Sequence, residues 1–352
     1  MNIPKEFTYN ELFSLAIKKP ESAQLEVTRN CPQSCFFCFR QCNPDIKFKT
    51  KSLAHWKGAI NKLVAIGVNK INFSGGEIFL FPNISELFHY AKKQGIGTLV
   101  VNTNGIINLK KHDIDIIDEL VFSIHGIKKD HDNITNFPHS FEKALESINY
   151  ALSKKCHVGI NTVVIPENIN KLNSIYNFFK KLDINFHSFN LSIDQNKISQ
   201  NPHKQKKLIC SYLKFIKKLP TRRRKLRHGM QNVIWEKKSF KSAIPLPHCA
   251  AGKYKLCIDY QGDIYPCRYF QTDQYKCGNV FKDDLEKVWK NGKGFKLFRE
   301  MILKNDMPIE CTTCYKKYKC RGGCLAWRIY NPKLKQYGRD IRCKFGNAHI
   351  RN

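Results

Sequence analysis

The sequence has no long apolar run and no export signal. Nowhere in its 352 residues do about 18 consecutive apolar residues occur, which argues against a transmembrane helix. The first 20 residues contain two acidic residues and no apolar run of signal-peptide length. We therefore expect no membrane partner and a cytoplasmic location.

Acidic residues are also scarce, which leaves a strongly basic chain. Lys and Arg number 60 against 29 Asp and Glu, giving a formal net charge of +31, and the densest basic patch lies at 221–229. Nucleic-acid-binding proteins carry such charge. Lysine, however, is spread over the whole sequence, and no basic motif interleaved with aromatics, as in RNA-binding modules, occurs. We therefore expect no nucleic-acid partner. The positive electrostatic field of the chain would equally attract an acidic peptide, an anionic metabolite or a redox partner.

A closed set of disulfide bonds is excluded as well. The cysteines number 15, an odd count, so disulfides cannot use all of them. Without an export signal, closely spaced cysteines more often bind metal than pair with one another. Their thiolates would be the ligands, in a reduced compartment.

Hydrophobic residues make up 42% of the chain and aromatic residues 12%, enough for a large domain and a smaller one. Segments rich in β-branched residues alternate with amphipathic helical patterns. The expected strands lie at 23–28, 69–77, 97–105, 119–126, 157–166 and 184–193, and the expected helices at 52–67, 82–94, 140–155 and 170–182. This alternation predicts an α/β fold with a parallel sheet, and its six units suggest a partial (β/α)6 barrel.

After residue 194 the amino-acid composition of the chain changes twice, at 195 and again at 249. We predict an N-terminal segment (1–22), the barrel core (23–194), a basic helical linker (195–248), a small cysteine-rich domain (249–346) and a tail (347–352). In barrels of this kind the chemistry lies on the loops that follow the strands. The cysteine loop after the first strand and the Ser74–Glu77 segment after the second are therefore expected at the same mouth.

The cysteine loop contains Cys31, Cys35, Cys38 and Cys42, with gaps of three, two and three residues. Four thiolates would suit a tetrahedral zinc site. A bacterial ferredoxin run looks similar but has gaps of two, two and three and ends in Cys-Pro. A third interpretation uses only the first three cysteines. Three thiolates on a four-iron cluster leave one iron open for a substrate or cofactor.

The spacing Cys31-x3-Cys35-x2-Cys38, with Phe37 before the last cysteine, resembles the signature of the radical S-adenosylmethionine (SAM) superfamily. The Ser74–Glu77 segment is similar to that family's Gly-Gly-Glu motif, whose glycines allow a close backbone approach to the SAM ammonium group. The resemblance implies that SAM chelates the open iron and that an electron from the cluster splits it to a 5′-deoxyadenosyl radical. The implied SAM contacts are Phe37, Gly75, Gly76, Glu77, Asn102, Ser123 and Asn161, with Asn104 and His125 as further candidates.

The barrel differs from that family in one position, and it contains one cysteine that the family's motif does not use. Many relatives place an Arg after a His-Asp pair to hold the SAM carboxylate, whereas this chain has no Arg after His131 and Asp132. Another group must then make that contact, or the contact is absent. Cys42 is expected to be a bystander.

The C-terminal cysteines, together with Gly262 and the segments GDIYPC and GNV, resemble the SPASM extension of radical SAM proteins. That resemblance implies two auxiliary four-iron clusters, three clusters in all; a pair of zinc sites is the alternative. Fully ligated clusters suit electron transfer. With Cys257 as an eighth ligand, the family's interleaving assigns Cys249, Cys257, Cys267 and Cys324 to the first auxiliary cluster, and Cys311, Cys314, Cys320 and Cys343 to the second. Cys156, Cys210 and Cys277 are left as spare thiols.

The resemblance also implies hydrogen-atom abstraction from a substrate, most often a peptide, with a low-potential electron donor such as flavodoxin or ferredoxin. We expect modification of a ribosomally made peptide. The segment before the first strand is too short for a fused leader-binding domain, so we expect a separate leader-binding protein or a role for the basic segment 222–227. The residues identify no substrate-facing acid or base.

Three alternatives remain open. One is oxidative tailoring of a haem-type or other small-molecule cofactor. A second is sulfatase maturation, which is disfavoured because Arg268 stands where that subfamily has an Asp base. The third is a non-catalytic iron–sulfur or zinc scaffold.

Overall fold

The computed structural model describes residues 19–192, 202–219, 226–228, 249–303, 311 and 323–329. Three predicted cluster ligands, Cys314, Cys320 and Cys343, lie outside these ranges, as do most of the N-terminal segment, the basic stretch 221–225 and the tail. No helix in the described part of the chain is long and apolar enough to span a membrane.

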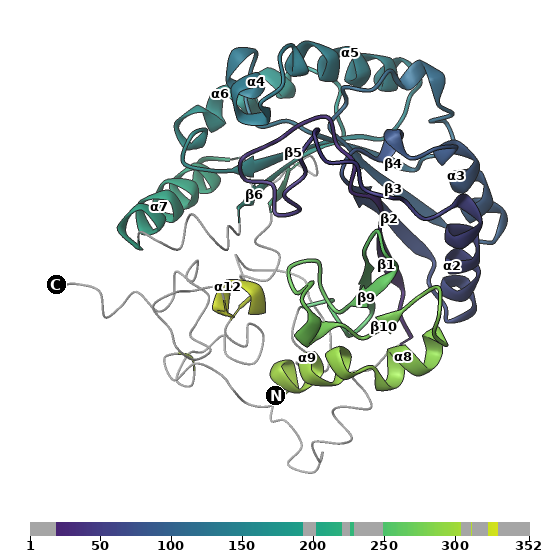
Figure 1. Ribbon diagram of the computed structural model, residues 1–352. Coiled ribbons are helices and arrows are strands. Elements are labelled where there is room, and N and C mark those ends of the chain that lie inside the picture. Colours follow the sequence, from purple (N-terminus) through teal and green to yellow (C-terminus); the bar gives the residue numbers. More distant parts are fainter. Residues whose placement is uncertain are drawn as a thin grey trace, which may run out of the picture.

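A curved sheet, parallel except where β9 (Asp263–Tyr265) pairs with β8 (Lys255–Ile258) and β10 (Gly278–Asn279), forms the centre of the molecule (Figure 1). Its first six strands are those predicted, and each pairs in parallel with the next along the chain. They are β1 (Ser22–Thr28), β2 (Lys70–Gly75), β3 (Thr98–Thr103), β4 (Glu119–Ser123), β5 (Val158–Val164) and β6 (Phe186–Leu191). The predicted α/β partial barrel is therefore confirmed.

Helices cover the outer side of this arc (Figure 1). Those between strands are α2 (Leu53–Ala65), α3 (Ile84–Lys93), α4 (Lys129–Thr135), α5 (Ser140–Ser153) and α6 (Leu172–Lys180), with short 3-10 turns η1 (Ile78–Leu80), η2 (Leu109–Lys111) and η3 (Ile169–Lys171). The short helix α4 was not predicted. Side-chain hydrogen bonds explain where two of these helices begin. The Ser52 hydroxyl accepts a hydrogen bond from the His55 amide before α2, and the Asp132 carboxylate accepts one from the Phe141 amide at the start of α5.

The segment predicted as a basic helical linker extends the alternation. It contributes helix α7 (Pro202–Lys218) and a short strand β7 (Leu226–His228), which pairs in parallel with β6. The helix was predicted and the strand was not. A three-residue strand is too short to produce a hydrophobic period in the sequence.

The cysteine-rich region is joined to the same sheet. It contains β8 (Lys255–Ile258), β9 (Asp263–Tyr265), η4 (Asp273–Tyr275), β10 (Gly278–Asn279), α8 (Leu285–Asn291), α9 (Lys293–Leu303) and α12 (Leu325–Ile329). In the described part of the chain the strand order is β10-β9-β8-β1-β2-β3-β4-β5-β6-β7, in a 10-stranded sheet. Because β8 pairs in parallel with β1, the C-terminal region is built directly onto the edge of the barrel.

Side chains alternate between the two faces of the sheet. On β1, Leu25 and Val27 join the large apolar core, whereas Gln24 and Glu26 lie on the inner face, where they bond to each other. A small separate cluster of Val100, Val121 and Phe186 fills one end of the inner face. The rest of that face is polar toward the carboxyl ends of the strands, where the candidate site lies.

Candidate active site

Backbone hydrogen bonds attach the Ser74–Glu77 segment to the start of the cysteine loop. The Gly76 amide donates to the Thr28 carbonyl, and the Glu77 amide donates to the Asn30 carbonyl, each at 2.8 Å. Gly75 has φ +139°, and a Cβ there would lie 2.1 Å from the Thr28 carbonyl oxygen. A Cβ at Gly76 would lie 2.2 Å from the Asn30 carbonyl oxygen. Both glycines are therefore required by the chain's own packing, a reason that the sequence reading did not anticipate.

The Glu77 carboxylate is fully buried and holds the end of β3. One oxygen accepts the Thr103 hydroxyl at 2.7 Å and the Phe79 amide at 3.2 Å, and the other accepts the Asn104 amide at 2.8 Å. Burial raises the pKa of Glu77 to about 7, although these donors oppose the rise. The second oxygen accepts one hydrogen bond only, so it keeps capacity for another donor.

Three thiols of the cysteine loop share one electrostatic environment. Burial and the neighbouring thiolates of Cys38 and Cys31 raise the pKa of Cys35. The side-chain amide of Asn104, on the loop after β3, donates to the Cys31 sulfur at 3.7 Å. The thiol of Cys42 is buried, and the neighbouring sulfurs of Cys31 and Cys38 raise its pKa. Cys42 therefore lies beside the predicted ligands rather than apart from them.

Helix α4 and its cap hold the other side of the loop. The Ser34 amide donates to the Thr135 carbonyl at 3.2 Å, and the Asn136 side-chain amide donates to the Ser34 hydroxyl at 2.8 Å. The Thr135 side chain is buried and bonds within its own turn and to Ser140. This segment follows the His131-Asp132 pair, and its hydrogen bonds to Ser34 position the cysteine loop.

The cysteine loop suits an iron–sulfur cluster for two reasons: its thiols can bind iron, and it contains buried hydrogen-bond donors without a partner. Among the described residues, Gln33 Nε2 and Arg40 Nε are buried and have no hydrogen-bond partner, and both belong to this loop. Cluster sulfur is an acceptor that would satisfy such donors. In the same residues no three His, Cys, Asp or Glu side chains converge closely enough to hold a single metal ion. A cluster needs a wider arrangement, because its thiolates bind separate irons.

Polar side chains line the inner face beside the loop. Asn102 donates to Asn72 Oδ1 at 2.5 Å, and Asn190 donates to Asn161 Oδ1 at 2.5 Å. The register aligns Ser123 with Asn161 across β4 and β5. The predicted contacts Asn102, Ser123 and Asn161 thus share one face, whereas Asn72 and Asn190 were missed. The sequence pattern that indicates Asn72 and Asn190 is the one that the three predicted residues also follow: a polar residue at every second position of a strand.

Phe37 packs against the loop after β4. Its ring lies edge-on to the His125 ring, with centroids 4.7 Å apart. The Val163 amide donates to His125 Nδ1 at 3.2 Å, so the ring proton lies on Nε2. Burial holds the pKa of His125 well below its usual range, with a smaller contribution from His131. His125 is therefore a neutral, fixed imidazole beside the cysteine loop.

Four described thiols of the C-terminal region gather near β8 and β9. Burial and the charges of Cys257, Cys249 and Cys324 raise the pKa of Cys267 well above its usual range. Burial and Cys324 raise the pKa of Cys249 to about 12. These four are the thiols predicted for the first auxiliary cluster. Cys277 instead belongs to the apolar core, and Cys311 is buried.

A buried carboxylate links the two cysteine-bearing regions. Glu26 on β1 forms an ion pair with Arg40 of the cysteine loop and accepts the side-chain amide of Gln271 at 3.3 Å. On the same face, the register pairs Cys257 of β8 with Gln24 of β1. The C-terminal thiols and the cysteine loop therefore flank one edge of the polar inner face.

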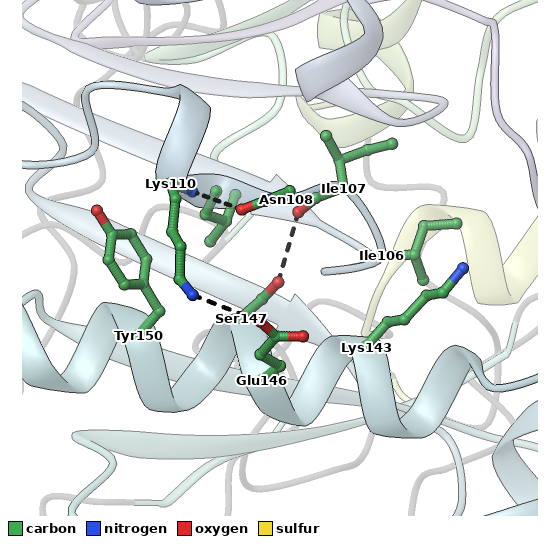
Figure 2. Close-up of a pocket in the computed structure, with 9 residues that line it drawn as sticks. Ile106, Ile107, Asn108, Lys110, Lys143, Glu146, Ser147 and Tyr150 are labelled. Atoms are coloured by element: carbon green, nitrogen blue, oxygen red, sulfur yellow. Dashed lines mark hydrogen bonds and ion pairs between the residues drawn. The ribbon is translucent and has the colours of Figure 1, made fainter.

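A cavity of about 180 Å³ lies outside the barrel, between the segment after β3 and helix α5 (Figure 2). Ser147 there donates to the Ile107 carbonyl at 3.4 Å, and Lys110 pairs with Glu146 at 3.7 Å. None of the predicted site residues lines this cavity. The candidate site is the inner face of the barrel and not this surface.

Two regions of the chain match known protein families. Residues 25–179 match the model of the radical SAM superfamily, and residues 249–315 match that of an iron–sulfur cluster-binding domain, SPASM. The antilisterial bacteriocin subtilosin biosynthesis protein AlbA of Bacillus subtilis is 25% identical over 85% of this chain and 68% of its own. An AdoMet-dependent heme synthase of Nitratidesulfovibrio vulgaris is 23% identical over 91% of each chain.

A solved structure shares the fold. Streptococcus suis SuiB bound to S-adenosylmethionine aligns with a TM-score of 0.72 and 19% identity, over 95% of this chain and 80% of SuiB. The chain belongs to the radical SAM superfamily and carries a C-terminal SPASM domain. It is an enzyme of oxidoreductase type that uses SAM and iron–sulfur clusters, as the sequence reading predicted.

Proposed function

We propose that this enzyme reductively cleaves SAM to a 5′-deoxyadenosyl radical and abstracts a hydrogen atom from a ribosomally made peptide, leading to a crosslink or a side-chain oxidation. The cofactor supplies the radical chemistry, and the chain's residues bind, orient and exclude water. We further propose that it works in the cytoplasm with a low-potential donor such as flavodoxin or ferredoxin.

The observation that carries this proposal is the pairing of β8 with β1. It brings Cys257 to the same face as Gln24, next to the Glu26–Arg40 pair that ends in the cysteine loop. Electrons can pass between a reactive centre and a second centre only when the two lie close together. A polar inner face between two thiol-rich loops is suited to a substrate that reacts at one centre and exchanges an electron with the other.

The assignment of residues follows from the family motifs and their placement. The SAM-binding cluster would be held by Cys31, Cys35 and Cys38. SAM itself would contact Phe37, Gly75, Gly76, Glu77, Asn102, Ser123 and Asn161. The first auxiliary cluster would use Cys249, Cys257, Cys267 and Cys324, and the second Cys311, Cys314, Cys320 and Cys343, which brings the total to three clusters.

The relatives support a peptide as substrate. AlbA takes part in the biosynthesis of a bacteriocin, and SuiB has been solved bound to its precursor peptide SuiA. A net charge of +31 would favour a peptide with acidic residues. A haem-type small molecule is the second candidate, because the heme synthase matches over almost the whole of both chains.

The test begins with anaerobic reconstitution of the full chain. We expect about twelve irons per chain and release of 5′-deoxyadenosine from SAM in the presence of a reductant. Incubation with a peptide encoded beside the gene should give a mass change in the peptide, whereas a tetrapyrrole should remain unchanged. Modification of the tetrapyrrole and not of the peptide would favour the second candidate. Tightly bound zinc without SAM cleavage would refute both.

The cysteine roles have their own test. Changing Cys31, Cys35 and Cys38 together to Ala should remove about four irons and abolish SAM cleavage while the auxiliary signals persist. Cys42→Ala is the matched control, since Cys42 is buried in the same loop and is assigned no iron. It should retain cleavage. Cleavage by the triple variant would show that the active site is assigned wrongly.

A further inference from the structure

Arg268 lies between the two cysteine-bearing loops. It directly follows Cys267, and its guanidinium stands over the Tyr269 ring at 4.9 Å and over the Phe39 ring at 5.9 Å. Its Nη2 donates to the Tyr269 hydroxyl at 3.0 Å. Phe39 directly follows Cys38. Aromatic rings from both loops therefore fix the guanidinium in place.

Nearby acidic groups are committed to other partners. Glu26 pairs with Arg40, and Asp263 pairs with a lysine. The Asp259 carboxylate accepts two backbone amides at 2.9 Å. In the described part of the chain none of these carboxylates forms an ion pair with Arg268. Arg268 is only the last of the groups that lower the pKa of Glu26, so no carboxylate neutralises its charge by direct contact.

The groups beside Arg268 that would become anions are two predicted cluster ligands, whose sulfurs would be thiolates when a cluster is bound. Cys267 is its neighbour in the chain, and Cys257 lies on β8, which pairs with β9 just before Cys267. The Tyr269 oxygen and then these two thiolates raise the pKa of Arg268. Arginine keeps its charge at every accessible pH, so this charge is permanent.

We propose that Arg268 is the counter-charge of the first auxiliary cluster and raises its reduction potential, so that the cluster accepts an electron from the substrate. The proposal rests on the function proposed above. A fixed positive charge stabilises the reduced, more negative state of a cluster. With the cluster bound, the substrate radical would give one electron to the oxidised cluster and one proton to water, because arginine cannot accept that proton.

The test is a redox titration of the reconstituted full chain, followed by electron paramagnetic resonance. Auxiliary signals are identified as those that do not change when SAM is added. Arg268→Met removes the charge and keeps an apolar stem on the two rings. It should lower the ratio of reduced to oxidised cluster about tenfold at a fixed potential, a shift of about 59 mV for one electron.

Two variants control the result. Arg268→Lys keeps the charge and should stay near the parent potential. Lys276→Met removes a charge that is paired with Asp263 in the same region, and it should leave the potential unchanged. An unchanged potential in Arg268→Met, or an equal shift in Lys276→Met, would overturn the proposal.

Arg268→Gln provides a second neutral variant if Arg268→Met does not assemble its clusters, and the same shift is expected. A parent protein that lacks any SAM-insensitive cluster would refute the proposed auxiliary site itself. A parent that has the cluster, with an unchanged potential in both neutral variants, would refute only the role of Arg268.

Discussion

The side-chain amide of Asn104 donates a hydrogen bond to the sulfur of Cys31, at 3.7 Å, and its backbone amide donates to Glu77. One residue after β3 therefore joins the cysteine loop to the carboxylate of the Gly-Gly-Glu segment. A hydrogen bond to a ligand sulfur stabilises the reduced state of a cluster, because that state carries more negative charge.

We predict that Asn104→Ala lowers the potential of the SAM-binding cluster and slows SAM cleavage about tenfold. Hydrogen bonds to charged groups contribute about 1.5–3 kcal/mol, which is enough for that effect. Cleavage is measured as 5′-deoxyadenosine released per cluster. Asn108→Ala is the control, since Asn108 caps the 3-10 turn in the same segment and touches no cysteine. Equal slowing in both variants would indicate a loosened segment rather than a lost bond to sulfur.

The buried pair of Glu26 and Arg40 gives a prediction about stability. Arg40→Met leaves the Glu26 carboxylate, 3% exposed, without its counter-charge, and such losses cost about 3–5 kcal/mol. We expect a lower melting temperature and a displaced cysteine loop, read as a loss of iron from the SAM-binding cluster. The double variant Arg40→Met with Glu26→Gln should recover much of the melting temperature. A double variant no more stable than the single one would show that the pair is not the cause.

The sequence predicted six strands, most helices and the placement of two motifs at one mouth, because hydrophobic periodicity and motif position are local properties. The Glu26–Arg40 pair could not be predicted. Alternation on β1 indicates that Glu26 faces inward, but its partner depends on how the loop folds back. The pairing of β8 with β1 was equally out of reach, since a strand of four residues carries little pattern and its partner lies far away in the chain.

The two glycines illustrate a different limit. The sequence predicts a close backbone approach at Gly75 and Gly76, with SAM as the approaching group, and that SAM contact stays a prediction. The structure places the carbonyls of Thr28 and Asn30 against them. A motif specifies which residue type is needed, whereas the contact that requires it is visible only in three dimensions.

Glu77 gives a prediction about pH. Its folded pKa of about 7 exceeds its ordinary value of 4.5, so the folded state binds the proton more tightly than the unfolded state. The resulting stabilisation is complete below about pH 4.5 and is lost as pH rises through about 7, with a magnitude of about 3 kcal/mol. We expect the melting temperature of the parent to fall between pH 5 and pH 8, by more than that of Glu77→Gln. The difference between parent and variant isolates Glu77 from other titrating groups, and a difference independent of pH would contradict the raised pKa.

Gly76 gives the sharpest test of how the site is built. A Cβ at this position would lie 2.2 Å from the Asn30 carbonyl oxygen and 2.8 Å from the Arg29 carbonyl carbon, and both are backbone atoms that cannot rotate away. Gly76→Ala should therefore push the cysteine loop off the end of β2 and reduce SAM-cluster occupancy several-fold, measured as SAM-sensitive resonance signal per chain. Gly58→Ala is the control: a Cβ at this exposed position of helix α2 meets nothing within 4 Å, and it should add up to about 1 kcal/mol of helix stability without changing the signal. Full cluster occupancy in Gly76→Ala would mean that the cysteine loop tolerates displacement. The backbone hydrogen bonds between the two motifs would then not be what holds the cysteines in place.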